Sequence, residues 1–282
     1  MRIVVFVAVF VITWYMLQLP IPLWASLLLL LLFWYSLGAP LFILLATRIP
    51  VDPPVKPFDP SEHDVSLDQL SFTGTATAQL RAAGFEPIGE LFFDWSGNRR
   101  GVVSSALVVV LQNDAGTRAG ATAIRVVAGG RERTRTAIEL RTRFAGHTRS
   151  TSNLTPSMSL PSDSPRRVHE RFPQVRDGAL LARVHETLLA REEGTPPLIP
   201  DPAVLVDAQR DEYRMIFDDL AAQGIYRLGA KGTHWAPTLY GAYLTMWQRA
   251  WPMNRIRDAR ARKRASARLA ELGLGTLDVG LA

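Results

Sequence analysis

Residues 23–46 form a stretch of 24 residues that contains no charged side chain. As an α-helix the stretch is about 36 Å long, whereas the hydrocarbon core of a bilayer is about 30 Å thick. A helix buried in a soluble protein rarely runs this far without a polar face. Trp24, Trp34 and Tyr35 supply aromatic side chains, and Arg48 follows the stretch. The sequence therefore predicts a membrane-spanning helix over residues 23–46, kinked at Pro40.

A second apolar run covers residues 3–19, and its 17 residues are close to the shortest length that spans a bilayer. Pro20 and Pro22 interrupt the helix between the two runs. A secretory signal peptide is the alternative, but its charged region contains only Arg2 and the terminal amine. No small-x-small cleavage site follows the run convincingly, since Leu23 stands two positions before Ala25. We therefore predict that residues 1–48 form an uncleaved transmembrane helical hairpin, and cleavage of the first run is left open.

The charges around this hairpin predict its orientation. The turn between the runs is uncharged, whereas Arg2, Arg48 and Lys56 all lie outside the pair. Basic residues favour the cytoplasmic side, so both ends of the hairpin are expected there. The sequence thus predicts an integral membrane protein whose soluble domain faces the cytoplasm.

Residues 49–60 are a proline-rich linker with five prolines. Such a segment favours extended polyproline II and acts as a semi-rigid spacer of about 3.1 Å per residue. An ordered strap lying along the domain is an equal alternative.

Residues 61–235 have the pattern of a soluble domain. A short helix ends at Gly84, and five β-rich segments follow, separated by turns rich in Gly and Asn. Helical patterns return at residues 177–192 and 201–223. Residues 155–173, rich in proline and serine, are predicted to be a surface crossing, that is, a connection without regular structure that runs over the surface of the domain. The predicted fold is α+β: an antiparallel β-meander of about five strands flanked by helices, tethered by the two-helix transmembrane hairpin.

Arginines alternate along residues 131–144. Side chains on a strand alternate between faces, so one face is expected to carry a row of guanidinium groups and the other to pack on the core. Arg125 and Arg149 are expected to extend the arginine face from neighbouring strands. Guanidinium groups suit phosphate or carboxylate partners, unless they pair with Glu132 or with the acidic helix at residues 211–219. The candidate anion-binding residues are Arg131, Arg133, Arg135, Arg141 and Arg143.

Residues 236–282 combine an aromatic stretch with a polybasic helix. The aromatic stretch is too short to span a bilayer, and the pattern is typical of a helix at an anionic membrane surface. The alternative places Trp247 and Trp251 in the domain core and the basic helix in solvent. The candidate membrane-surface residues are Trp247, Trp251, Arg255, Arg257, Arg260, Arg262, Lys263 and Arg264.

No motif in the chain requires a particular chemistry. The chain has no cysteine, its five histidines do not have the spacing of metal ligands, and no cofactor, metal or catalytic residue is predicted. Few aromatic residues interleave with the arginines, so nucleic acid is not favoured as a partner. The arginine row and the polybasic carboxyl end favour an anionic one, either the lipid leaflet or an acidic protein. The sequence does not indicate the oligomeric state.

The leading hypothesis is a non-enzymatic, membrane-anchored protein whose cytosolic domain docks on that anionic partner. The alternative is a membrane-bound hydrolase or transferase acting on a lipid or other anionic substrate. Its acid–base groups would come from His147, His169 and His185, and at least two of them would have to meet in one place.

Overall fold

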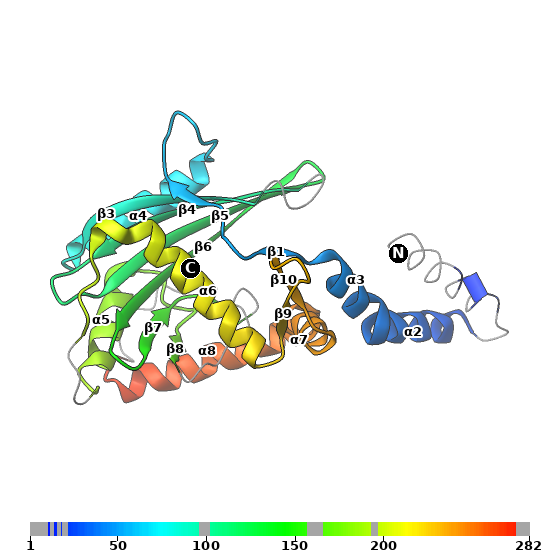
Figure 1. Cartoon of the computed structure of the whole chain (residues 1–282). Helices are drawn as coiled ribbons and strands as arrows, with labels where there is room; N and C mark the ends of the chain where they lie inside the picture. The colour runs from blue at the N-terminus through cyan, green and yellow to red at the C-terminus, as the bar shows by residue number, and fades with distance from the viewer. Residues whose placement is uncertain are drawn as a thin grey trace. The chain divides into compact units, whose positions relative to one another are not determined.

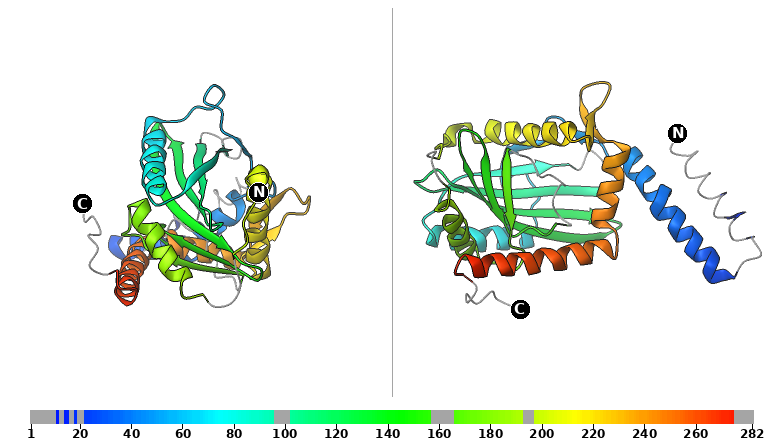
Figure 2. Two further views of the ribbon diagram at one scale, coloured as in Figure 1. Left: turned by 90° about the vertical axis from the view of Figure 1, so that its left-hand side faces the viewer. Right: turned by 90° about the horizontal axis from the view of Figure 1, so that it is seen from below.

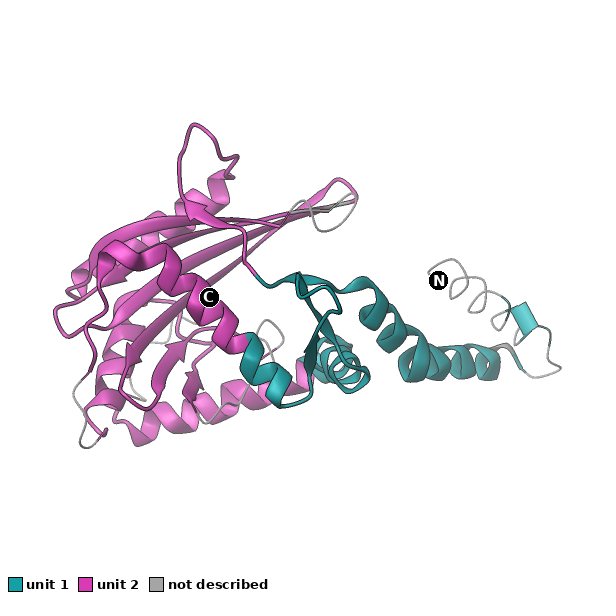
Figure 3. Ribbon diagram, viewed as in Figure 1, with its two compact units in different colours: residues 1–51, 217–254 teal, residues 52–216, 255–282 magenta. Residues whose placement is uncertain are grey.

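The chain forms two compact units (Figure 3). One consists of residues 1–51 and 217–254, and the other of residues 52–216 and 255–282. The computed structural model describes residues 22–95, 102–156, 166–192 and 197–274, with residues 11, 14, 15 and 18. The predicted first span, residues 3–19, therefore lies almost entirely outside the described residues.

An apolar helix begins the first unit. It comprises α2 (Leu23–Phe33), a π-helical turn η1 (Trp34–Gly38) and α3 (Ala39–Ala46). Among the described residues it is the one helix that is long and apolar enough to cross a membrane, over Trp24–Ala46. The sequence analysis, in contrast, predicts two spans. Only 11% of its most apolar stretch is buried, whereas the core helix of a soluble protein is mostly buried.

The rest of the first unit comes from residues far along the chain. A three-stranded antiparallel sheet has the order β1 (Ile49–Pro50), β10 (His234–Pro237), β9 (Tyr226–Leu228). The helix α7 (Leu239–Arg249) follows β10 and packs against α3. Gly241 permits close packing within this unit, because a Cβ atom there would lie 1.9 Å from the carbonyl oxygen of Ile225.

The second unit is built on a seven-stranded mixed sheet, which confirms the predicted α+β class (Figure 1). The predicted five-strand antiparallel meander lies in its centre as β3 (Glu86–Asp94), β4 (Val102–Gln112), β5 (Arg118–Ala128), β6 (Arg131–Arg143) and β7 (Thr148–Ser152). The alternation of apolar and polar residues, with turns between the runs, accounts for this part of the sheet.

Two further strands complete the sheet, and the sequence analysis did not predict either. The proline-rich segment contributes β2 (Val55–Pro57), which pairs with β3, so the ordered strap and not the free spacer is observed. Part of the expected surface crossing forms β8 (Arg167–Arg171), which pairs parallel to β7. The surface-crossing prediction is therefore wrong at β8, and the sheet is mixed, not purely antiparallel.

Helices cover both faces of this sheet (Figure 2). The main core places Ile138 and Leu140 of β6 against α4 (Leu67–Ala82), α5 (Gly178–Leu189) and α8 (Met253–Glu271). On the other face Leu91 and Phe93 pack with Leu205, after the short helix η3 (Pro202–Val204). Leu205 begins α6 (Leu205–Ala222), whose residues up to 216 belong to this unit.

The two predicted later helices are present as α5 and α6. The short helix predicted before Gly84 is α4, and its 16 residues begin at Leu67 because Ser66 and Gln69 form a capping box that fixes its start.

Candidate functional site

The exposed arginines gather in the first half of β6. Arg131, Arg133 and Arg135 are exposed, as is Arg143 at the end of the strand. Among the described residues, no ion pair joins these four side chains to an acid. The expected alternation is clearest further along, where Ile138, Leu140 and Thr142 are buried. These four arginines are therefore available to an external anion, and their binding role stays a prediction.

Arg141 differs from the other predicted arginines because it belongs to an internal ion-pair network. Its guanidinium contacts Glu139 at 2.8 Å and also pairs with Glu212 of α6. Glu139 in turn contacts Arg167 of β8 at 2.6 Å. Burial alone would raise the pKa of the Glu139 carboxyl, but Arg141 and Arg167 outweigh it and hold that pKa well below its usual range. Arg141 thus makes the contact with the acidic helix that the alternative interpretation expects.

Arg125 and Arg149 do not extend the arginine face, so that prediction is wrong. Arg125 stands opposite Thr134, and Arg149 stands opposite Thr142, which places both on the other face of the sheet. Both are held by acids: Arg125 contacts Asp64 at 2.7 Å, and Arg149 contacts Glu170 at 2.9 Å. The arginine face of β6 is formed by odd-numbered residues. In the observed register, odd-numbered Arg125 and Arg149 stand opposite even-numbered residues of β6, so they lie on the other face.

The helix α8 has one face in the core and one face in solvent. Ala261, Ala265 and Leu269 are buried at a spacing of four residues. Arg260, Arg262, Lys263 and Arg264 are exposed on the remaining surface. Small buried residues allow the helix backbone to lie close to the domain, while the long basic side chains remain free to reach a partner. Arg255 is exposed and Arg257 half-buried at the start of the same helix.

Trp247 and Trp251 lie in the first unit and are not core residues. Their exposed fractions are 49% and 72%, and Leu239 and Tyr240 of α7 are exposed to a similar extent. The buried side of α7 contains Ala242 and Met246. The exposed surface of α7 is therefore largely apolar and aromatic, which is unusual for a helix facing water.

The three candidate histidines are not brought together. His169 hydrogen-bonds to Ser152 on one face of the sheet. His185 hydrogen-bonds to Thr142 and Thr151, and the side chains of these two threonines lie on the other face. His147 stacks on Phe144 with ring centroids 4.9 Å apart and lies 3.7 Å from Glu192. The enzymatic alternative needs two of these groups at one reacting centre, and this geometry does not provide them.

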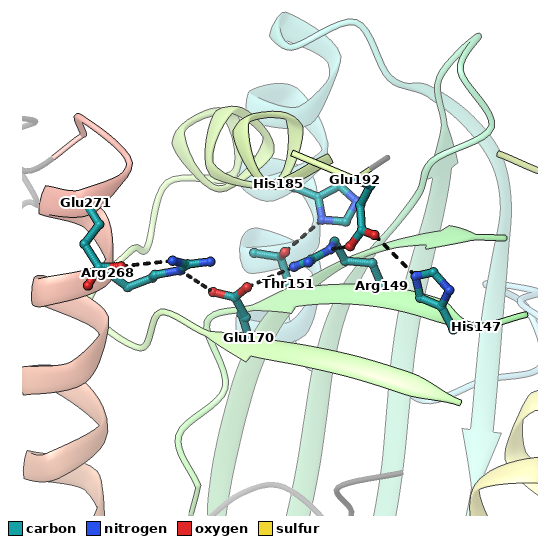
Figure 4. Close-up of polar contacts among 8 residues, drawn as sticks. All are labelled: His147, Arg149, Thr151, Glu170, His185, Glu192, Arg268 and Glu271. Carbon is teal, nitrogen blue, oxygen red and sulfur yellow. Dashed lines mark hydrogen bonds and ion pairs between the residues drawn. The ribbon is translucent and has the colours of Figure 1, made fainter. Parts of the chain in front are cut away.

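His185 is the centre of a buried polar network that the sequence analysis missed, and Figure 4 shows its contact with Thr151. Its two ring nitrogens lie 2.9 Å from the Thr142 hydroxyl and 2.8 Å from the Thr151 hydroxyl. Thr142 also contacts Thr117 at 2.7 Å. Burial, with a smaller effect of Arg149, lowers the pKa of His185 to about 3, so the ring is neutral. Both ring nitrogens are therefore occupied by the protein itself.

A chain of ion pairs crosses the same face of the sheet (Figure 4). Glu192 pairs with Arg149, which contacts Glu170. Arg268 of α8 lies 3.1 Å from Glu170 and 2.9 Å from Glu271. The chain links α8 to β7 and β8, and no spacing in the sequence could have indicated it because its members come from separate segments.

Comparison of the chain with models of protein families, with curated proteins and with solved structures found no match. In the part of the chain that the structure describes, no three His, Asp or Glu side chains are grouped in a way that could hold a metal ion.

Proposed function

We propose that the protein is an integral membrane protein with two amino-terminal spans, and that its cytosolic α+β domain docks on the anionic lipid leaflet. The role is non-enzymatic: the spans hold the domain near the leaflet, and basic side chains bind lipid phosphates. The observation that carries this proposal is the division of α8 into a buried alanine face and an exposed basic face.

The magnitude favours a lipid surface as the partner. Each basic residue near an anionic leaflet contributes about 1 kcal/mol. Arg260, Arg262, Lys263 and Arg264 together would therefore contribute about 4 kcal/mol, equivalent to about a thousandfold in affinity. The enzymatic alternative has no comparable support, because its histidines lie apart.

The absence of cysteine permits a direct test on the full chain. A fluorophore is attached to an Ala259→Cys variant, at an exposed position on α8, and the chain is reconstituted in vesicles that carry a headgroup quencher. We expect strong quenching in vesicles with anionic lipid and weak quenching in neutral vesicles. The quenching should fall in about 0.5 M salt, where the Debye length is about 4 Å.

Charge reversal identifies the surface involved. The triple variant Arg262→Glu, Lys263→Glu, Arg264→Glu should lose the quenching. The companion variant, Arg131→Glu, Arg133→Glu, Arg135→Glu, changes the total charge by the same amount on β6. Retained quenching in this variant assigns the docking to α8, whereas lost quenching would add the predicted anion-binding arginines to the docking surface. Quenching that ignores lipid charge, salt and both variants would remove the leaflet as the partner and favour an acidic protein.

A further inference from the structure

The apolar helix changes its surroundings at the η1 turn. In α2, Leu27, Leu28, Leu31 and Leu32 are all about half exposed or more. In α3, Pro40 is buried and the other residues are half-buried, except Phe42, which is 53% exposed. The helix α7 and the strand β10, both of the same unit, pack against α3. Exposed apolar side chains therefore occupy most of α2, whereas in α3 they are limited to Phe42.

Two hydrogen bonds join η1 to the α7 region. The Tyr243 hydroxyl donates to the carbonyl oxygen of Ser36, and the Tyr35 hydroxyl donates to the carbonyl oxygen of Trp251 at 3.2 Å. Tyr35 and Trp251 therefore lie at the same level of the unit. Trp34, Tyr35, Trp247 and Trp251 make this level rich in aromatic side chains, as at a membrane–water interface.

A span that continued to the end of α3 conflicts with a charge at this level. Tyr35 lies about 16 Å along the helix before Ala46, close to the midplane of a hydrocarbon core about 30 Å thick. Trp251 would lie at the same depth, and the exposed Arg249 stands two residues before it, at the end of α7. A guanidinium near the midplane of a bilayer is costly.

We infer that the cytosolic boundary of the membrane lies at the Trp34–Gly38 turn, and that α3 and α7 form a folded cap at the lipid headgroups. This inference rests on the proposed membrane anchoring. It places the second span at residues 22–38, which are 17 residues, the same number as in the first apolar run at residues 3–19. The two arms of the hairpin are then equal in length, whereas a span over residues 23–46 makes them unequal.

Single cysteines test this boundary, because the natural chain has none. Leu31→Cys and Phe42→Cys are matched, since the native side chains are 54% and 53% exposed. Lys56→Cys, at an exposed position on β2, is the positive control. Each full-length variant is treated with a charged maleimide in membranes opened to both sides. The labelled fraction is compared with that of the same sample denatured in SDS.

We expect Phe42→Cys to label as fast as Lys56→Cys. Leu31→Cys should label at least about tenfold more slowly, because a charged reagent partitions poorly into hydrocarbon. If Phe42→Cys and Leu31→Cys are both protected, the span continues through α3 and the inference is wrong, while the anchoring stands. If both label as fast as Lys56→Cys, the helix is not in a bilayer and the proposed anchoring itself fails.

Discussion

Two arginines of β6, Arg141 and Arg143, have different surroundings. Arg141 lies between Glu139 and Glu212, whereas Arg143, two residues later on the same face, is exposed. We expect Arg141→Gln to lower the free energy of unfolding by about 2–3 kcal/mol, because Glu139 would keep only Arg167 and Glu212 would lose its ion pair with Arg141. Arg143→Gln should change it by less than about 0.5 kcal/mol. Urea denaturation of the detergent-solubilised variants measures both. Equal effects would contradict the assignment of Arg141 as an internal residue.

His185 and His169 predict a dependence of stability on pH. Burial is the main cause that lowers the pKa of each ring to about 3, well below the value of about 6.5 in an unfolded chain. Between these values the unfolded state binds more protons, so stability is present above about pH 6.5 and is lost as the pH falls towards 3. From pH 7.5 to pH 5 each histidine should account for about 2 kcal/mol of that loss.

The histidine substitutions separate the two contributions. His185→Gln should remove about half of the loss between pH 7.5 and pH 5, and a double variant with His169→Gln should remove most of it. The measurement is the free energy of unfolding at the two pH values. A wild-type chain whose stability does not change over this interval would show that both rings are protonated in the folded state, and about half of the expected loss would show this for one of them.

At the scale of one element, the apolar helix depends on α7 for a hydrogen bond. Pro40 has no N–H, so the carbonyl oxygen of Ser36 lacks the donor that residue i+4 normally supplies, and Tyr243 donates to it instead. We expect Tyr243→Phe to lower stability by about 1–2 kcal/mol. In a Pro40→Ala background the backbone N–H returns, and Tyr243→Phe should then cost much less. Thermal unfolding of the four proteins in this double-mutant cycle checks the coupling, and additive effects would contradict it.

The elements also show how far the sequence alone could lead. The strands β3 to β7 and the helices α5 and α6 were predictable, because local alternation, turn residues and caps specify them. The strand β8 was not, since its residues Arg167, His169 and Arg171 look like a polar loop until they pair with β7. The face of Arg149 depends on register, which the alternation within one strand cannot supply. The contact between Tyr243 and Ser36 joins residues 207 positions apart, and no local pattern indicates such a pair.

At the scale of the whole molecule, the hydrogen bonds between α7 and η1 bear on the signal-peptide alternative. A signal sequence that ended after the apolar helix would be removed, yet this helix is packed within the first unit by residues 239–251. We therefore predict that residues 23–46 stay in the chain. Cleavage after the first apolar run, at residues 3–19, would leave these hydrogen bonds intact, so retention of the amino terminus and a second crossing remain separate expectations of the proposed anchoring. Closed vesicles of known orientation, carrying the chain with an amino-terminal tag, test both expectations.

In vesicles with the cytosolic face outward, trypsin should digest the domain, because its many exposed arginines offer cleavage sites. In vesicles of the opposite orientation the domain should stay intact until detergent opens the membrane. Before digestion the tag should be found on the full chain, whose own mass is 31.3 kDa without the tag. Digestion only in the opposite orientation would place the domain on the outer side, and the leaflet on which α8 is proposed to dock would then be the outer one. Since anionic lipid and the preference for basic residues both belong to the cytoplasmic side, that single result would remove the electrostatic basis of docking.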